Sequence, residues 1–441
     1  MARAFGRLPV APHPTEAVRA TLFDGEHCAN LGKNMFISYK QWRAELTGLQ
    51  ECIIQNFLGD ATTAEFSGHL ISFRRNFMQT LKMLKPQSLI TAVSCAALVA
   101  CAGGSVDPGN EAARANEPKP AANAQMQTVL DELAALGAKP LQTLTVAQAR
   151  TQPTPADAVK SLLAKQGKST VPEAVGSVED RSIPGPGGSI PIRIYKPAGA
   201  GPFPVALYIH GGGWVIATLD TYDSSARALT NAAGAIIVST HYRQAPEFRF
   251  PAAHEDAYAA YQWTLANATS LGGIAKQIAV IGESAGGNMA TGVAIRARDN
   301  NIQRPVHQAL IYPVTNYAYD SPSQIQNRDA APLGTPALMW FYDKYLPTPA
   351  DGANPLFSVL RAPSLANLPS ATVITADIDP LRSEGRAYAQ RLGEAGVSVD
   401  YGNYVGVAHE FFGMGAVLTD ARSAVARVGT NLKAAFAKTG D

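Results

Sequence analysis

The sequence predicts a mainly parallel α/β fold, because short unbroken apolar runs alternate with helical segments along the chain. An apolar run without polar alternation indicates a strand that is covered on both faces of its sheet. Residues 178–197 differ, since they alternate in polarity and predict two strands around a Gly-Pro turn. The unbroken runs are residues 204–209, 235–238, 278–281, 309–312, 372–375 and 397–400.

The composition allows a large core and argues against a nucleic-acid partner. The chain has 441 residues, of which 46% are hydrophobic, and this length fits two or three domains or one large domain with appendages. The 37 Lys and Arg against 35 Asp and Glu give a formal net charge of +2 without a basic run, so a phosphate backbone is not an expected partner. The last of the four cysteines is Cys101, which excludes a disulfide framework or a Cys-rich zinc site after it.

The N-terminal part of the chain contains a segment that is typical of an export signal. Residues 88–100, SLITAVSCAALVA, are uncharged and follow two lysines. The run is shorter than the roughly 18 to 20 apolar residues that a membrane-spanning helix needs. Its end, from Leu98 to Cys101, resembles the lipobox of bacterial lipoproteins, in which the cysteine is lipidated. We therefore predict a lipoprotein-type signal peptide at residues 78–101, export to the bacterial cell envelope and membrane anchoring through Cys101; the alternative is a buried helix that ends in cysteine.

The segments around this signal have their own predictions. A signal peptide begins near the start of translation, and Met78 opens a suitable charged segment. Residues 1–77 are therefore predicted to be a non-native or disordered extension upstream of the true start; a small native helical domain is the alternative. Residues 102–125 are rich in Gly, Ala, Asn, Pro and Glu and lack apolar periodicity, which predicts a flexible linker. The folded domain is expected over residues 126–441, with helices in residues 126–166.

A G-x-S-x-G motif at residues 282–286 places a serine at the end of a predicted strand. An apolar run precedes the motif and a helical stretch follows it, which is the context of a nucleophile elbow. Small residues at both flanks tolerate the strained turn that exposes the serine hydroxyl at the edge of the sheet. A tight turn with a capping serine is the alternative. The order of strand, motif and helix favours Ser284 as a nucleophile.

A second glycine motif, HGGGW at residues 210–214, follows the apolar run at 204–209. Acyl transfer needs backbone N–H groups that approach a developing oxyanion, and glycines permit that approach. We therefore predict an oxyanion hole formed by the amides of Gly212, Gly213 and Ala285. Either motif alone is consistent with a turn, but both follow buried strands in the order that acyl transfer requires.

Five segments carry a resemblance to a known family: HGGGW at 210–214, HYRQAPEFRFPAA at 241–253, GESAGGNMA at 282–290, DPLRSEG at 379–385 and GVAHEF ending at Phe411. The chain resembles the hormone-sensitive-lipase-like (bacterial family IV) esterases over most of residues 126–441. The resemblance implies an α/β-hydrolase fold, with a mostly parallel central sheet, helices on both faces and a helical cap from residues 126–166 and about 322–346. The departures from the family pattern are His241 and Gln244 for Asp and Leu, Glu283 for Asp, and Ser383 for a charged residue.

A serine nucleophile needs a histidine that takes its proton and an acid that orients the histidine. In this fold the chain order is serine, acid, histidine, and His409 alone among the eight histidines follows every plausible acid. The resemblance also implies His409. Asp377 and Asp379 both follow the apolar run at 372–375, and the residues by themselves leave both open. The resemblance implies Asp379.

The predicted function is hydrolysis of carboxylic esters with short-to-medium acyl chains, through a triad of Ser284, His409 and Asp379 and an acyl-enzyme intermediate. No cofactor is expected, and no metal, because neither His254-Glu nor His409-Glu continues into an HExxH motif. An amidase or acyltransferase with the same triad is the related alternative. A ligand-binding protein of the same fold is a weaker alternative, since the histidine is present.

Aromatic residues are the predicted substrate contacts. Trp214, at the end of the HGGGW motif, is expected to bind substrate. The cluster Trp340, Phe341 and Tyr342 lies in the predicted cap. It is expected either to line an acyl pocket or to pack the cap against the core.

Overall fold

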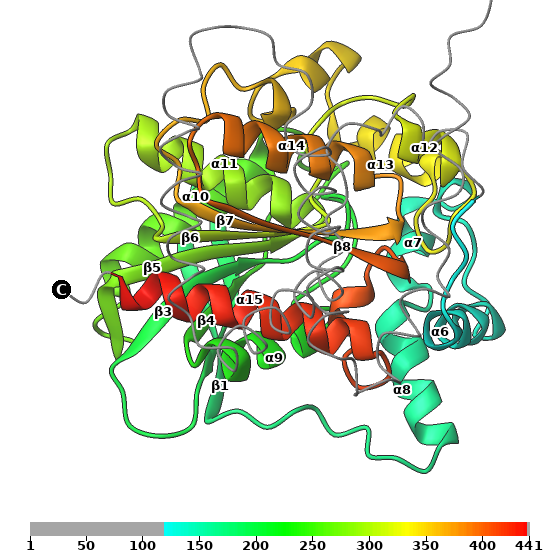
Figure 1. Cartoon of the computed structure of the whole chain (residues 1–441), viewed down its shortest axis with the longest axis horizontal. Helices are drawn as coiled ribbons and strands as arrows, with labels where there is room; N and C mark the ends of the chain where they lie inside the picture. The colour runs from blue at the N-terminus through cyan, green and yellow to red at the C-terminus, as the bar shows by residue number, and fades with distance from the viewer. Residues whose placement is uncertain (1–118, 439–441) are drawn as a thin grey trace, which may run out of the picture. The chain divides into compact units, whose positions relative to one another are not determined.

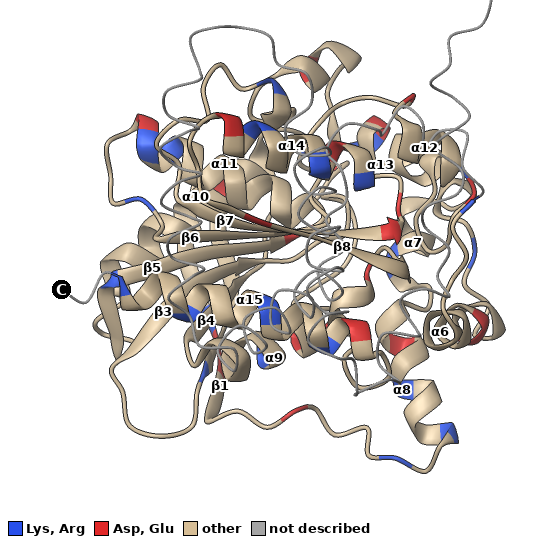
Figure 2. Cartoon of the chain, in the orientation of Figure 1, with Lys and Arg blue, Asp and Glu red and all other residues tan. Residues whose placement is uncertain are grey.

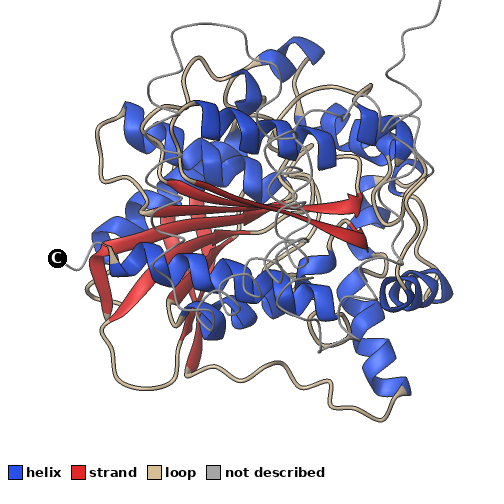
Figure 3. Cartoon of the chain, viewed as in Figure 1, coloured by secondary structure: helices blue, strands red, loops and turns tan. Residues whose placement is uncertain are grey.

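An eight-stranded sheet forms the centre of residues 119–438, the part of the chain that the computed structural model describes. The strand order is β1-β2-β4-β3-β5-β6-β7-β8, and helices cover both faces of the sheet (Figure 3), which confirms the predicted α/β fold. The predicted extension, signal peptide and lipidated Cys101, and most of the predicted linker, lie outside the described residues and stay predictions. The strands are β1 Ser177–Gly185, β2 Gly188–Lys196, β3 Phe203–Ile209, β4 Ile236–Thr240, β5 Gly273–Glu283, β6 His307–Ile311, β7 Ser370–Ile378 and β8 Val399–Ala408.

The sheet is antiparallel at one edge and parallel elsewhere. β1 and β2 form a hairpin, and β2 pairs antiparallel with β4. The pairs β4-β3, β3-β5, β5-β6, β6-β7 and β7-β8 are all parallel. Because parallel strands run in one direction, the carboxyl ends of β3, β5, β7 and β8 meet at the same edge of the sheet. The residues that follow these strands therefore come together in space.

Alternating side chains explain why the central strands are apolar at every position. In β3, Val205, Leu207 and Ile209 belong to one core, whereas Ala206 and Tyr208 belong to the other. Successive side chains of a strand point to opposite faces, so a strand covered twice has no polar face. Figure 1 shows the two helical layers on opposite sides of the sheet. One layer contains α10 Ala252–Asn267, α11 Ala285–Asp299 and α14 Arg382–Glu394, and the other contains α9 Asp223–Ala233 and α15 Thr419–Ala437.

Helices are present in the predicted N-terminal helical segment and dock onto the sheet. α6 begins at Ala124, one residue before the predicted end of the linker, because the side chain of Asn123 caps it by accepting from the Met126 N–H at 2.9 Å. The Asn123 side-chain amide donates to Asp420 in α15 at 3.0 Å, and its backbone N–H donates to Gly406 in β8 at 2.8 Å. The elements are α6 Ala124–Ala135, η1 Leu141–Thr143, α7 Val146–Thr151 and α8 Pro155–Lys165.

The second predicted cap segment contains two helices, α12 Pro322–Gln326 and α13 Thr335–Tyr345. Figure 1 places α7, α12 and α13 near the end of the sheet toward which the arrows of β7 and β8 point. They therefore lie at the carboxyl edge where the strand ends meet. The remaining short turns are η2 Pro349–Ala353, η3 Val359–Arg361 and η4 Phe411–Gly413.

Charged residues of both signs are interspersed along the described part of the chain (Figure 2). This agrees with the small formal net charge of +2 for the whole chain. Between residues 119 and 438, the structure has no helix that combines the length and the apolarity needed to cross a bilayer.

A buried asparagine on α11 provides a test of the core. Asn288 donates to the carbonyls of Val314 and Phe357 at 3.0 and 2.6 Å, and its oxygen contacts His254 Nε2 at 2.8 Å. Asn288→Ala leaves these buried groups unpaired, so the free energy of unfolding should fall by about 3 kcal/mol in urea titrations. Gln390→Ala, an exposed change on α14, should alter it by less than about 0.5 kcal/mol. Equal effects of the two changes would contradict this account.

Candidate active site

Ser284 stands in a strained turn between β5 and α11. Its backbone has φ 56° and ψ −119°, a conformation that residues other than glycine rarely adopt. The Ser284 N–H donates to the Ile311 carbonyl at 2.9 Å, and the Ser284 carbonyl accepts from Asn288 at 3.1 Å. The strain is therefore held by the neighbouring strand and by the first turn of the helix, as in a nucleophile elbow.

The glycines of the motif permit a very close approach of backbones at this turn. A β-carbon on Gly286 would lie 2.0 Å from the carbonyl oxygen of Ile209 at the end of β3. A β-carbon on Gly282 would lie 2.1 Å from the Gly286 carbonyl oxygen. Only glycine fits at these two positions, so the motif is explained by packing of α11 against β3 and β5.

Ser284, His409 and Asp379 form a chain of hydrogen bonds at the carboxyl edge of the sheet. Ser284 follows β5, Asp379 follows β7 and His409 follows β8. His409 Nε2 lies 3.0 Å from the Ser284 hydroxyl oxygen, and His409 Nδ1 lies 2.7 Å from Asp379 Oδ2. With the proton on Nδ1, the ring donates to Asp379 and leaves Nε2 to accept the Ser284 proton. The hydroxyl is largely enclosed, since only 5% of Ser284 is exposed.

The structure distinguishes the two aspartates at the carboxyl end of β7, of which Asp377 lies within the strand and Asp379 directly follows it. Asp379 is fully buried, and its second oxygen accepts from the Leu381 N–H at 2.8 Å. Asp377 instead pairs with the guanidinium of Arg382 at 3.0 Å. Asp379 is therefore the carboxylate that reaches His409.

The surroundings of His409 favour its charged form. Burial by itself lowers the pKa of His409, but the Asp379 charge and hydrogen bond oppose it, and Glu410 and Glu283 add further negative charge. The net result is a pKa above the ordinary value of 6.5. A raised pKa makes the ring a stronger base toward Ser284.

The loop after β3, residues 210–217, supplies unpaired backbone donors. Gly212 and Gly213 have φ 96° and 56°, and Ala285 is the first residue of α11. Within residues 119–438, the N–H groups of Gly212, Gly213 and Ala285 have no hydrogen-bond acceptor. First-turn and loop N–H groups without partners are what an oxyanion hole requires. We call residues 210–217 the oxyanion loop.

Four side chains outside the oxyanion loop hold its backbone and its histidine. Three of them, Tyr242, Gln244 and Arg150, donate to loop carbonyls, and the fourth, His241, contacts the ring of His210. A loop held at this many points is pre-organised for binding negative charge. The contacts are Tyr242 to Gly211 (2.7 Å), Gln244 to Ile216 and Ala217 (2.7 and 2.9 Å), Arg150 to Val215 (2.9 Å) and His241 Nδ1 to His210 Nε2 (2.9 Å).

Comparison with known proteins agrees with this arrangement. Residues 206–413 match the model of an α/β-hydrolase fold family. An ethyl acetate hydrolase of Pseudomonas putida is 37% identical over 243 residues, which cover 53% of this chain and 75% of the relative. A carboxylesterase of Mycobacterium tuberculosis is 39% identical over 264 residues, covering 59% and 83%.

Solved structures of ester hydrolases are also similar to this chain. An ester hydrolase from the metagenome of Lake Arreo, solved with a bipyridine phosphonate derivative, is 36% identical with a TM-score of 0.65, covering 72% of this chain and 99% of that one. An esterase of Pyrobaculum calidifontis is 37% identical with a TM-score of 0.64, covering 71% and 98%. The chain belongs to the hormone-sensitive-lipase-like esterases of the α/β-hydrolase superfamily. As a member of this family, it is a carboxylic ester hydrolase.

The structure shows the contacts or the burial of each of the four residues that depart from the family pattern in this esterase. His241 and Gln244 both hold the oxyanion loop, as described above. Ser383 exchanges two hydrogen bonds of 3.0 Å with Ser323, which ties α14 to α12 of the predicted cap. Glu283 lies directly before Ser284 and is fully buried. The departures therefore adjust the surroundings of the Ser284–His409–Asp379 chain and leave the chain itself unchanged.

The aromatic residues predicted to contact substrate or line the cap lie in different surroundings. Trp214 is fully buried and stacks on Tyr345 with ring centroids 4.6 Å apart, which places it in the aromatic core, and its contact with substrate stays a prediction. Phe341 lies directly against the oxyanion loop, since a β-carbon on Gly213 would be 2.3 Å from its ring. Tyr342 is buried and packs on core aromatic rings.

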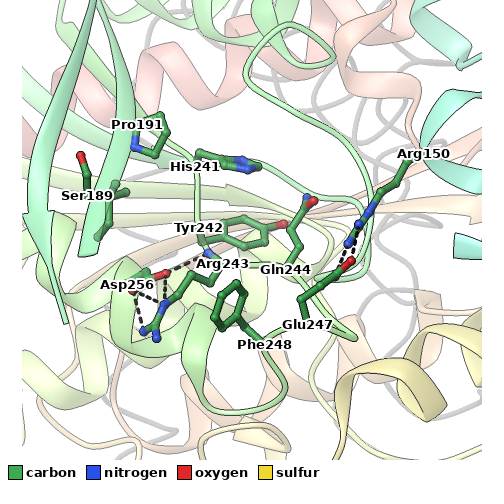
Figure 4. A pocket seen from close by; sticks show the side chains of 11 residues that line it. Arg150, Ser189, Pro191, His241, Tyr242, Arg243, Gln244, Glu247, Phe248 and Asp256 are labelled. Carbon is green, nitrogen blue, oxygen red and sulfur yellow. Dashed lines mark hydrogen bonds and ion pairs between the residues drawn. The ribbon is translucent and has the colours of Figure 1, made fainter. Parts of the chain in front are cut away.

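A pocket of about 330 Å³ includes in its lining the four side chains that hold the oxyanion loop (Figure 4). It lacks the serine, histidine and aspartate of the hydrogen-bonded chain. Its charges are paired, since Arg150 contacts Glu247 at 2.7 Å and Arg243 contacts Asp256 at 2.8 Å. We therefore assign this pocket to the support of the loop. No cluster of metal-binding residues occurs in the described region.

Two carboxylates beside the hydrogen-bonded chain were not anticipated. Glu410 Oε1 lies 3.7 Å from His409 Nε2 and accepts from the Tyr222 hydroxyl at 2.7 Å. Glu283 accepts from the hydroxyls of Tyr208 and Tyr312. Burial, followed by the charge of Glu410, raises the pKa of Glu283 to about 7, although the tyrosines oppose this.

A sequence signal for these carboxylates did exist. Glu283 and Glu410 are direct chain neighbours of Ser284 and His409. The tyrosines that bind them come from β3, the loop after β6 and the start of α9, which no local pattern connects to these glutamates.

Two of the three glycines of α11, Gly286 and Gly292, provide a matched test of the elbow. Gly286→Ala must push the backbone of β3 away, so we expect loss of nearly all esterase activity and a lower melting temperature. Gly292→Ala meets only the flexible end of Leu356 at 3.3 Å and should change stability by less than about 1 kcal/mol. Activity assays and thermal unfolding of both variants check this. Full activity in the Gly286→Ala variant would show that the close approach is unnecessary.

Proposed function

We propose that this esterase hydrolyses carboxylic esters through an acyl-enzyme on Ser284. The observation that carries the proposal is the hydrogen-bonded chain from Ser284 through His409 to Asp379, beside three unpaired amides. His409 Nε2 takes the proton of Ser284 as its oxygen attacks the ester carbonyl. The ring then gives this proton to the departing alcohol. Asp379 orients the ring and stabilises its positive charge.

The second half of the reaction uses the same groups in reverse order. Water attacks the acyl carbonyl, His409 Nε2 takes a proton from the water, and the bond from the carbonyl to Ser284 breaks. The proton on His409 passes to the Ser284 oxygen, which restores the free enzyme. In both halves the amides of Gly212, Gly213 and Ala285 would bind the oxyanion. The scheme needs no cofactor.

We propose short-to-medium acyl chains as substrates. Phe341 lies against Gly213 and bounds the space next to the proposed oxyanion hole. The similarity to an ethyl acetate hydrolase supports a short acyl group. Amide hydrolysis and acyl transfer to an alcohol use the same residues, and competition between water and an added alcohol distinguishes them from ester hydrolysis.

A series of p-nitrophenyl esters of increasing acyl length tests the proposal on the full chain. We expect hydrolysis that is fastest with short-to-medium chains, and a loss of at least about a thousandfold in Ser284→Ala. Ser270→Ala, an exposed change of the same type, should leave the rate unaltered. Undiminished hydrolysis by folded Ser284→Ala would refute Ser284 as the nucleophile.

Asp377 and Asp379, at the carboxyl end of β7, offer a matched pair. Asp379→Asn preserves shape but removes the charge that orients and stabilises protonated His409, so kcat should fall by about a thousandfold or more. Asp377→Asn weakens only the contact with Arg382 and should lower kcat by less than about tenfold. Steady-state kinetics on folded variants provides the comparison, and the reverse ranking would assign the acid to Asp377.

The pH dependence of the rate reports on His409. Only the neutral ring accepts the Ser284 proton, so kcat/KM should fall as the pH drops through the pKa of His409. Since that pKa is raised, the midpoint of the acidic limb should lie above 6.5. A pH-rate profile from about pH 5 to 9 measures it. A midpoint well below 6.5 would mean that burial outweighs the surrounding carboxylates.

A further inference from the structure

A small cavity lies beside His409, between the beginning of α8, the beginning of α9 and η4. Its volume is about 30 Å³, and Glu283 and Glu410 both contribute to its wall. Such a volume holds about one or two water molecules. The wall includes Glu410, the chain neighbour of His409, and Glu283, the chain neighbour of Ser284.

One hydroxyl in this wall, that of Ser225, is buried and has no hydrogen-bond partner among residues 119–438. Ser225 is only 1% exposed, and among the described residues its Oγ makes no hydrogen bond. It is close enough to Glu283 to favour the charged form of that carboxyl. Buried polar groups are nearly always hydrogen-bonded to protein or to ordered water. A water molecule in the cavity would complete the bonding of Ser225.

Glu410 connects this cavity to the reacting nitrogen of His409. The Tyr222 hydroxyl donates to Glu410 Oε1 at 2.7 Å, and the same oxygen lies 3.7 Å from His409 Nε2. The Glu410 side chain is 23% exposed, which leaves it open to water on one side. A water molecule that donates to Glu410 is thereby brought next to the atom that must deprotonate it.

We propose that the cavity of Ser225, Glu283 and Glu410 binds water, and that Glu410 positions this water against His409 Nε2 for hydrolysis of the acyl-enzyme. The proposal rests on the proposed function of Ser284 and His409. In the step, the water oxygen forms a bond to the acyl carbonyl while one water proton moves to His409 Nε2. The bond from the carbonyl to Ser284 then breaks, and the Ser284 oxygen takes the proton from His409. Glu410 keeps its own protonation state throughout and acts as a positioning residue.

The two half-reactions separate this role from a general effect on His409. With p-nitrophenyl acetate, the release of p-nitrophenolate in the first turnover measures acylation. The decay of the acetylated enzyme, followed by intact mass spectrometry, measures deacylation. Glu410→Gln keeps an oxygen that can accept from Tyr222 but loses the charge that holds water. We expect acylation to stay within about threefold of the wild type and deacylation to slow about tenfold, so that the acetyl-enzyme accumulates.

Two further variants complete the design. Ser225→Val occupies the cavity from its other wall and should also slow deacylation more than acylation. Glu255→Gln, an acidic position on α10 that pairs with Arg296, is the matched control and should alter neither step. Methanol added in excess replaces water as the acceptor, so it should restore turnover in the Glu410→Gln variant.

The outcomes are distinguishable. Equal slowing of acylation and deacylation in Glu410→Gln would overturn the water role, because Glu410 would then act on His409 alone. Unchanged deacylation in both folded variants would overturn it as well. If the wild-type protein forms no acetyl-enzyme and releases no phenolate, the proposed function itself fails, and the inference fails with it.

Discussion

The close contact between Gly286 and the end of β3 is the constraint on which the site depends. A β-carbon at Gly286 would lie 2.0 Å from the Ile209 carbonyl oxygen, so only glycine lets the first turn of α11 pack this closely on the end of β3. Ser284, which directly precedes α11, has a positive φ of 56°, and the oxyanion loop directly follows β3. The positions of Ser284, of the Ala285 amide and of the amides in the oxyanion loop therefore depend on the same backbone packing.

The electrostatics of the site centre on His409. Asp379 contacts one ring nitrogen and Glu410 approaches the other, while the Tyr312 ring packs against the imidazole with centroids 4.5 Å apart. Tyr312 in turn donates to the buried Glu283. Negative charge on several sides explains why the pKa of His409 is raised although burial opposes it. The same carboxylates give the ring a strong preference for the proton it would receive during the reaction.

Support of the oxyanion loop comes from segments that are far apart in the sequence. Arg150 belongs to α7, near the N-terminal end of the described residues, and it donates to Val215 in the loop and pairs with Glu247. Gln244 and His241 come from the segment after β4. One N-terminal helix, α7, thus contributes directly to the geometry of the site.

The sequence by itself determined the strand pattern, the elbow at Ser284 and the order that selects His409. These features are local or follow from chain order: an apolar run covered on both faces, glycines that permit a turn, and a single histidine after every plausible acid. Tertiary structure decided the rest. Asp377 and Asp379 are both at the end of β7, and their side chains differ in direction. Only the fold shows that Asp377 pairs with Arg382 and that Asp379 pairs with His409. Trp214 packs on Tyr345 from α13, and Glu410 is held by Tyr222 from the beginning of α9. These partners are distant in sequence, and their contacts arise from the crossing of strands and helices, which no local pattern encodes.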